Sequence, residues 1–333
     1  MGRTSIKKQL GGRSVRDWFC GLLAAVAIVS SPVALGNEYP SKPITLIVPY
    51  APGSGMDAMS RLIGQGLSDR LKQPVLIDNK AGANGTLGTA ALMRAAPDGY
   101  TLGMGNSGTL ASSPNLMKSV PYDSIVNFAP IGRIGSFIFM LTVNSSVPAN
   151  SVQELVDYSK ANPGKLSYAV ANSVGMAVME LLKASHGLNI TAVPYRSMPQ
   201  AVADLIAGRV SILVVDRGPI LPHLQSNTVR ALMLTNGQRS RLQPEVLSSR
   251  EAGTDIDLIS WVAMFAPAGT PGNIVNQVSA ELRVVVDDPK LRDRLALAGF
   301  ETNGSSPEEV SEVLKADIAR WKKLVADAGI EPQ

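Results

Sequence analysis

The chain has 333 residues, of which 45% are hydrophobic, and a formal net charge of +4. This length can bury a sizeable core and indicates two domains. The excess positive charge lies in residues 1–36, which hold five of the 31 Lys and Arg residues and one of the 27 Asp and Glu residues. The rest of the chain has 26 charges of each sign, so composition gives no reason to expect binding to nucleic acid or to an anionic membrane.

Residues 1–36 are organised like a secretory signal peptide. Basic residues precede an apolar stretch at 19–29, and Ala34-Leu35-Gly36 supplies the small residues for cleavage after Gly36. The apolar stretch is shorter than the roughly 20 residues that a membrane span needs. We therefore expect a periplasmic protein, with an uncleaved anchor as the alternative. Cys20 is the one cysteine, so the chain after Gly36 needs no disulfide.

After the signal peptide, predicted strands alternate with predicted helices. The first half contains strands at 44–49, 75–78 and 100–104 and helices at 57–72 and 86–95. Such alternation predicts parallel strands with helices covering both faces of the sheet.

A second α/β run follows an apolar strand at 137–143, and another apolar strand at 261–267 ends it. Two helices follow, the last of them capped by Ser306. Two apolar strands that bracket a middle unit indicate a chain that crosses twice between two lobes. We expect one lobe to comprise residues 37–141 and 262–333 and the other to comprise residues 142–261.

One motif favours an enzyme. Residues 103–108 fit the G-x-G-x-x-G pattern of nucleotide-binding loops. However, Pro114 interrupts the helix that should follow, and Asp123 does not end a second strand. An exported α/β enzyme with a nucleotide cofactor therefore stays as an alternative. With two histidines, no paired cysteines and no HExxH or G-x-S-x-G motif, we expect no catalytic residues, no metal and no cofactor.

A different feature recurs along the chain, a loop of small residues between a strand and a helix. Such loops occur at 51–55, 81–86, 105–108, 171–175 and 196–198. The carboxyl ends of parallel strands meet at one edge of the sheet, where ligands bind. Free N–H groups at helix starts attract anions, and glycine lets a ligand approach the backbone. The loops therefore predict a site for a small carboxylate, unless they are ordinary turns.

Three charged side chains near these loops have two interpretations each. Asp57 is expected to cap the helix that begins there, and contact with the ligand is the alternative. Arg196 either pairs with a ligand carboxylate or lies on the rim of its lobe. Asp216 ends a buried strand and is either structural or directed toward the hinge.

A series of short motifs runs through the chain after the signal peptide. These are residues 39–44 (YPSKPI), 48–53 (VPYAPG), Asp57, 81–85 (AGANG), 96–102 (APDGYTL), 122–123 (YD), 128–131 (FAPI), 193–196 (VPYR), 204–209 (DLIAGR) and 265–271 (FAPAGTP). In this order and over this span, the chain resembles the Bug-type (tripartite tricarboxylate transporter) periplasmic solute-binding proteins.

The resemblance implies a type II periplasmic-binding-protein fold, with two α/β lobes, two crossover strands and a ligand cleft between the lobes. It implies a receptor, not an enzyme, that captures a carboxylate with backbone amides and passes it to a transporter or a sensor protein. We expect a monomer. The ligand-binding residues expected from the loops and the resemblance together are Tyr50, Ala51, Gly53, Ser54, Gly55, Asp57, Ala83, Asn84, Gly85, Ser107, Thr109, Asn172, Ser173, Arg196, Ser197 and Asp216.

Several positions depart from the family's pattern. Ser54 replaces the usual glycine, residues 197–199 read Ser-Met-Pro, and residues 172–176 lack a histidine that the family often has. Arg217 also follows Asp216 where a neutral residue is more usual. Most of these changes lie in the second lobe, so they leave the identity of the ligand open but not the fold.

Overall fold

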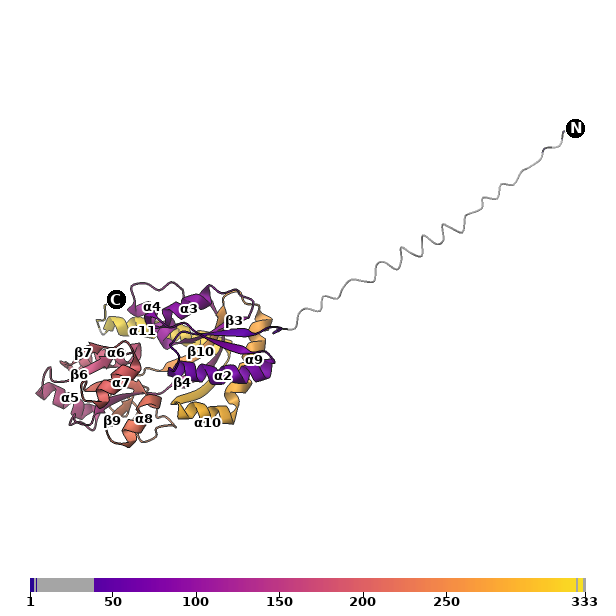
Figure 1. The fold of residues 1–333 in the computed structure, drawn as a ribbon. Helices are drawn as coiled ribbons and strands as arrows, with labels where there is room; N and C mark the ends of the chain where they lie inside the picture. Colours follow the sequence, from indigo (N-terminus) through magenta and orange to yellow (C-terminus); the bar gives the residue numbers. More distant parts are fainter. Residues whose placement is uncertain (3, 5–38, 328, 332–333) are drawn as a thin grey trace. The chain divides into compact units, whose positions relative to one another are not determined.

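The computed structural model describes residues 1–2, 4, 39–327 and 329–331 (Figure 1). Residues from Pro40 onward form one compact unit. The predicted signal peptide falls almost wholly on residues outside those described, as does its cleavage site after Gly36.

The first sheet has six strands in the order β11-β4-β10-β3-β1-β2. Strands β3, β1 and β2 are parallel, whereas β10 runs antiparallel to both β3 and β4. The strands are β1 (Ile44–Val48), β2 (Val75–Asn79), β3 (Thr101–Asn106), β4 (Phe128–Phe137), β10 (Ser260–Pro267) and β11 (Phe300–Ser305).

The second sheet has five strands in the order β7-β6-β8-β5-β9. Strands β7, β6 and β8 are parallel, and β5 runs antiparallel to β8 and β9. Both sheets thus place an antiparallel strand, which arrives from the other sheet, beside three parallel ones. The strands are β5 (Phe139–Asn144), β6 (Ser167–Val170), β7 (Thr191–Pro194), β8 (Ile212–Asp216) and β9 (Val229–Leu234).

The chain crosses between the sheets twice, as the sequence predicts. It passes from β4 to β5 at Ile138 and returns between β9 and β10. Near the first crossing, the Ile138 amide donates to the Gly299 carbonyl at 3.3 Å. Gly218 packs so closely here that a Cβ atom on it would lie 2.9 Å from the Ala298 carbonyl oxygen. The first crossing and the start of α8 therefore pack backbone to backbone against the turn between α10 and β11.

Helices cover both faces of each sheet. On the first sheet, α3 and α11 lie on one face and α2, α9 and α10 on the other (Figure 1). Helices α5 to α8 accompany the second sheet. The helices are α2 (Gly55–Leu71), α3 (Thr86–Met93), α4 (Ser113–Leu116), α5 (Val152–Ala161), α6 (Ser173–His186), α7 (Met198–Ile206), α8 (Arg217–Gln225), α9 (Gly272–Asp287), α10 (Pro289–Leu297) and α11 (Pro307–Asp327), with short turns η1 (Ala83–Gly85) and η2 (Gly108–Ser112).

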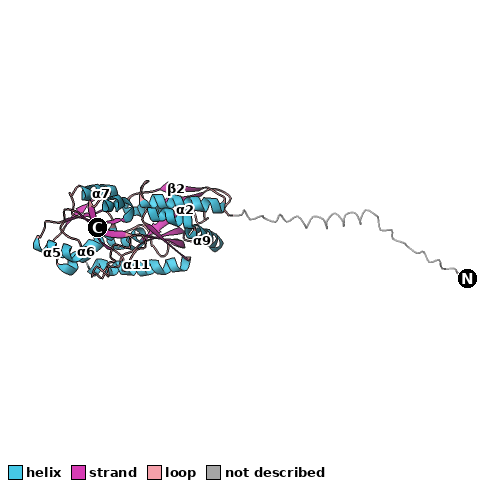
Figure 2. Cartoon of the chain, turned by 90° about the horizontal axis from the view of Figure 1, so that it is seen from below, coloured by secondary structure: helices cyan, strands magenta, loops and turns pink. Residues whose placement is uncertain are grey.

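The long helix α11 contacts both halves of the unit. It packs on β4, and Trp261 Nε1 on β10 donates to Asp317 Oδ2 at 2.7 Å. Its Trp321 and Leu324 side chains join the apolar cluster of the second sheet, which includes Val178. Figure 2 shows α11 running alongside α6. The helix that the sequence assigns to the first lobe therefore also contributes to the core of the other.

Two strands are poorly predicted by sequence. The sequence pattern predicts one strand at 137–143 and two final helices, whereas β4 begins at Phe128 and α9, α10, β11 and α11 follow β10. The glycines of β4 make this strand hard to recognise in the sequence, because glycine is typical of turns. A Cβ atom on Gly135 would lie 2.0 Å from the Glu301 carbonyl oxygen, so glycine is required where β11 pairs with β4.

The titration of the Asp317 carboxyl affects the stability of the folded protein. Burial raises the pKa of Asp317 from 3.8 to about 6, although Trp261, Arg320 and Arg133 act in the opposite direction. Between these values the folded protein holds the proton more tightly than the unfolded chain. The free energy of unfolding therefore falls as the pH rises through this window.

We expect Asp317→Asn to keep an acceptor for Trp261 and to remove the fall in the free energy of unfolding that the Asp317 titration causes. The variant should match the wild type near pH 3.5 and exceed its free energy of unfolding by about 2 kcal/mol above pH 7. Urea unfolding at both pH values measures the difference. A variant that matches the wild type near pH 3.5 but is less stable above pH 7 would show that the Asp317 charge is stabilised by Arg133 and Arg320 more than it is destabilised by burial.

Candidate functional site

The predicted loops of the first lobe meet at one edge of the first sheet. Strands β3, β1 and β2 are neighbours and parallel, so their carboxyl ends lie side by side. The chain leaves these ends to begin η2, α2 and η1. The three loops therefore form a continuous surface, which we call the first edge.

The loop after β1 uses several of its amides internally. Ser54, not Asp57, is the N-cap of α2, and its Oγ accepts from the Asp57 amide at 3.2 Å. The Ser54 amide donates to the Ala51 carbonyl at 3.2 Å, and the Gly53 amide donates to Asp57 Oδ2 at 2.9 Å. Among the described residues, the amides at the start of α2 that keep no acceptor are those of Gly55 and Met56.

Asp57 holds this loop in place. Its side chain is 4% exposed, and both carboxylate oxygens accept hydrogen bonds from Arg61 and from either Gly53 or Asn79. Burial alone would raise the pKa of Asp57, but the hydrogen bonds from Arg61, Gly53 and Asn79 outweigh it and the pKa lies below its usual value. Because both of its oxygens are bonded within the chain, the Asp57 carboxylate positions the loop.

The loop after β2 has an unusual backbone. Its φ angles are positive at Gly82 (137°), Ala83 (45°), Asn84 (53°) and Gly85 (87°). Left-handed φ angles are rare for residues with a Cβ atom and store on the order of 1 kcal/mol each. Ala83 and Asn84 are exposed, and their amides have no acceptor among the described residues. Strained, exposed donors of this kind are typical of a binding loop.

The loop after β3 is tied to the other two. Asn106 Nδ2 donates to the Tyr50 hydroxyl at 3.1 Å, and the Thr109 amide donates to Asn106 Oδ1 at 2.9 Å. Thr109 is fully buried, its Oγ1 accepts from the Asn106 amide at 3.2 Å, and its methyl group fills the space that a side chain on Gly85 would need. Thr109 thus packs the loops together, and its hydroxyl is not available to a ligand.

Ser107 differs from Thr109 in having an unused hydroxyl. The side chain is 1% exposed, and its Oγ has no hydrogen-bond partner in the structure. Ser107 precedes η2, which is a π-helical turn, and such turns are frequent at functional sites. A buried hydroxyl without a partner costs about 1 to 3 kcal/mol of stability. The Ser107 hydroxyl is therefore suited to a hydrogen bond with a ligand or a water molecule.

The parallel strands of the second sheet end at a second edge. Asn172 follows β6, where its side chain accepts from the Gly175 amide at 2.6 Å and donates to the Val214 carbonyl at 3.1 Å. Asn172 caps α6, so most of the hydrogen-bonding capacity of its side chain is used within the protein. Arg196 and Ser197 follow β7 and are exposed, and neither side chain makes a hydrogen bond or ion pair with the described residues. No contact brings these two residues to the first edge.

The two edges touch at two points. Ser112 Oγ in η2 donates to Ser173 Oγ at the start of α6 at 3.0 Å. At the start of α2, a Cβ atom on Gly55 would lie 3.2 Å from the Phe137 ring and 4.0 Å from Asp216 Oδ2. The first edge therefore lies close to Ser173 and Asp216 of the second edge, and a side chain at Gly55 would press against the Phe137 ring of β4.

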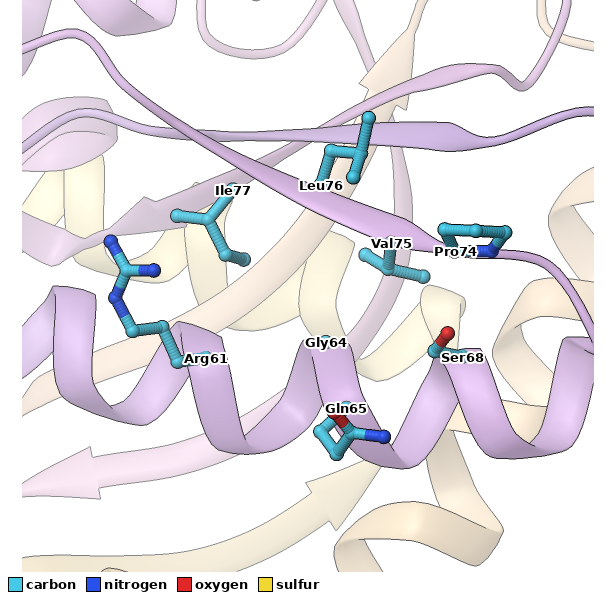
Figure 3. Close-up of a pocket in the computed structure, with 8 residues that line it drawn as sticks. All are labelled: Arg61, Gly64, Gln65, Ser68, Pro74, Val75, Leu76 and Ile77. Carbon is cyan, nitrogen blue, oxygen red and sulfur yellow. The ribbon is translucent and has the colours of Figure 1, made fainter.

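Two hollows lie elsewhere on the surface. A groove of about 430 Å³ runs between α2 and β2, lined by Arg61, Gly64, Gln65, Ser68 and Pro74–Ile77 (Figure 3). Another, of about 280 Å³, lies beside α8. None of the predicted ligand-binding residues lines either hollow. Among the described residues, no cluster of His, Cys, Asp and Glu could hold a metal ion, and no helix has the length and apolar character of a membrane span.

The G-x-G-x-x-G motif is not a phosphate cradle. Gly103 and Gly105 lie within β3, not in a loop. A Cβ atom on Gly103 would lie 2.5 Å from Leu92, and one on Gly105 would lie 2.6 Å from Leu110. These glycines allow close packing of the strand, so the geometry removes the sequence basis for a nucleotide cofactor.

Sequence reasoning missed several residues of the first edge. Asn79 and Asn106 are the last residues of β2 and β3, and Arg61 lies one helical turn after Asp57. Polar residues that directly end parallel strands are a signal that could have found the two asparagines. The free Met56 amide could not have been found, since it depends on which neighbouring amides are already bonded.

Comparison with known proteins identifies the family. The sequence model of the tripartite tricarboxylate transporter family receptor matches residues 59–330. The chain belongs to this family. Its members are periplasmic solute-binding receptors and not enzymes, in agreement with the fold and the resemblance.

The similarity extends over nearly whole chains. BugT of Bordetella pertussis is 31% identical over 93% of this chain and 96% of its own length. Three solved structures each match over their full length: Rpa4515 of R. palustris with adipate (30% identity, TM-score 0.82, 89% of this chain), periplasmic binding protein BugD (29%, 0.79, 89%) and MatC of Rhodopseudomonas palustris with bound malate (28%, 0.77, 86%).

We expect Asp57→Ala to destabilise the protein by about 1 to 2 kcal/mol, because Gly53, Asn79 and Arg61 lose their common acceptor. Denaturant unfolding of wild type and variant measures this change. Asp69→Ala is the matched control, since Asp69 lies exposed on the same helix with one hydrogen bond from Gln65, and it should change stability by less than about 0.5 kcal/mol. Equal effects of the two substitutions would contradict the positioning role of Asp57.

Proposed function

We propose that this protein is a periplasmic receptor that holds a small organic acid between its two edges and delivers it to the membrane subunits of a tripartite tricarboxylate-type transporter. The lobes close on the ligand by a hinge at the two crossings, and the receptor acts as a monomer. It performs no chemistry on the ligand.

The observation that carries this proposal is the set of free donors at the first edge. The amides of Gly55, Met56, Ala83 and Asn84 have no acceptor among the described residues, and they lie where three parallel strands end. Amides at a helix start carry partial positive charge and suit a carboxylate. The unpartnered Ser107 hydroxyl adds a further donor at the same edge.

The relatives support a carboxylate ligand. The solved structures that resemble this chain include one with adipate and one with bound malate. Both ligands are carboxylates, and they differ in length and in the hydroxyl group of malate. This difference suits a fold in which the first edge takes a carboxylate group and the second edge reads the remainder of the ligand.

A thermal-shift screen tests the binding half of the proposal. A carboxylate ligand that binds only the folded protein should raise its melting temperature in proportion to the logarithm of its concentration. The panel should hold mono-, di- and tricarboxylates, hydroxy acids, amino acids and aromatic acids. Absence of any shift across this panel at millimolar concentration would contradict a carboxylate receptor.

Two glycine variants locate the site. Gly55→Leu should lower affinity at least about a hundredfold, because its side chain must occupy the gap toward Phe137 and Asp216. Gly53→Asn is the control, since Gly53 has a φ of 81°, a value that Asn tolerates, and nothing within 4 Å of an added Cβ atom. It should bind within about threefold of wild type. Equal loss in both variants, or in neither, would contradict the donor assignment to Gly55 and Met56.

The transport half needs a cellular measurement. Cells that carry the membrane subunits should take up the labelled ligand only when this receptor is present, and Gly55→Leu should abolish that uptake. Ligand binding without receptor-dependent uptake would instead favour delivery to a sensor protein.

A further inference from the structure

Asp216 is an unusual carboxylate. It occupies the N-cap position of α8, yet its side chain makes no capping hydrogen bond. In contrast, Ser54, Ser151, Asn172 and Asp288 all cap the helices that follow them. Asp is among the best N-cap residues, but Pro219 at the third position of α8 has no N–H, so Asp216 lacks one of the two donors that a capping side chain usually finds.

The Asp216 carboxylate lies between its own helix and the first edge, with Oδ2 3.6 Å from the position of a Cβ atom on Gly218 of α8. Its Oδ2 lies 4.0 Å from the position of a Cβ atom on Gly55, at the start of α2. The side chain keeps partial solvent access although protein surrounds it. The Gly55 and Met56 amides do not donate to it, so a negative charge stands beside the free donors without using them.

No positive charge neutralises Asp216 within the described residues. Burial raises the pKa of Asp216 to about 6, although its own backbone amide acts in the opposite direction. The adjacent Arg217 is turned away, with its Nε donating to Gln243 Oε1 at 2.7 Å and its guanidinium also donating to the Ala296 carbonyl at 3.3 Å. Such an unpaired carboxylate is unfavourable in a crowded site unless a partner arrives.

We propose that Asp216 selects ligands that carry an ammonium group on the carbon next to the bound carboxylate, so that the receptor takes an α-amino acid. This inference rests on the proposed function, because it assumes that the first edge binds the ligand carboxylate. The closeness of Asp216 to Gly55 sets the position of the ammonium group. A carboxylate on the amides of Gly55 and Met56 leaves only a short span to Asp216, which a group on the adjacent carbon can bridge.

The same geometry disfavours an unsubstituted acid. A ligand carboxylate beside the Asp216 carboxylate brings two negative charges together in a partly desolvated site. An ammonium group placed between them replaces that repulsion with a charge-assisted hydrogen bond. A hydroxyl group can donate a hydrogen bond to Asp216 but carries no charge. The expected order of affinity on one carbon skeleton is therefore amino, then hydroxy, then unsubstituted acid.

Matched ligands test the proposal at pH 7.5 by calorimetry. Three sets keep the skeleton constant: propionate, lactate and alanine; succinate, malate and aspartate; glutarate, 2-hydroxyglutarate and glutamate. In the set that fits the cleft, wild-type protein should bind the amino compound at least about tenfold more tightly than the unsubstituted acid. In Asp216→Asn this ratio should fall to about threefold or less.

The control is Asp157→Asn, which removes a charge from an exposed position on α5 in the same lobe and should leave the ratio unchanged. The order within the wild type tests the proposal even if Asp216→Asn folds poorly. Wild-type protein that binds succinate or glutarate as tightly as its amino analogue would overturn the inference and leave the carboxylate receptor intact. So would an Asp216→Asn variant that binds all three ligands of a set more tightly by the same factor. Failure of all nine ligands and of the wider carboxylate panel would overturn the inference together with the proposed function.

Discussion

The buried carboxylate of Asp57 is the interaction on which the first edge depends. It joins the loop after β1, the end of β2 and the first turns of α2 through Gly53, Asn79 and Arg61. Because Arg61 neutralises the charge, the edge gains an organising centre without a net negative charge that would repel an anion. The Gly55 and Met56 amides stay free because the first turn of a helix has no intrahelical acceptors, and Ser54 caps only the Asp57 and Ala58 amides. Local folding thus decides which donors a ligand meets.

The two edges contribute different kinds of group. The first offers backbone amides, which every member of such a fold can supply regardless of side chains. The second offers side chains, of which Asn172 serves the fold, Ser173 meets Ser112 across the gap, and Asp216 is without a partner. In the proposed function, the first edge recognises a general chemical group and the second distinguishes among the molecules that carry it. A change at position 216 should therefore alter specificity more than stability.

The sequence was informative wherever local pattern determines structure. The small-residue loops at 51–55 and 81–86 follow parallel strands of one sheet as predicted, because alternating strands and helices leave few other topologies. It was less informative where contacts between distant residues determine the structure. Gly135 is typical of a turn in sequence, but it lies in β4 against the Glu301 carbonyl of β11. Asp57 and Thr109 were expected at the ligand because of their positions, but their polar atoms are occupied within the chain. Hydrogen-bond partners of that kind depend on distances that no single sequence displays.

The left-handed residues of the second loop have a thermodynamic consequence. Ala83 and Asn84 have φ angles of 45° and 53° in a loop that closes on itself, since the Gly85 amide donates to the Gly82 carbonyl at 2.9 Å. A loop already fixed in this way loses its conformational freedom when the protein folds, not when the ligand arrives. The entropy change of binding then reflects mainly displaced water and the motion of the lobes. A small ligand that makes few contacts can thus still bind, since little of the free energy of those contacts is used to order the loop.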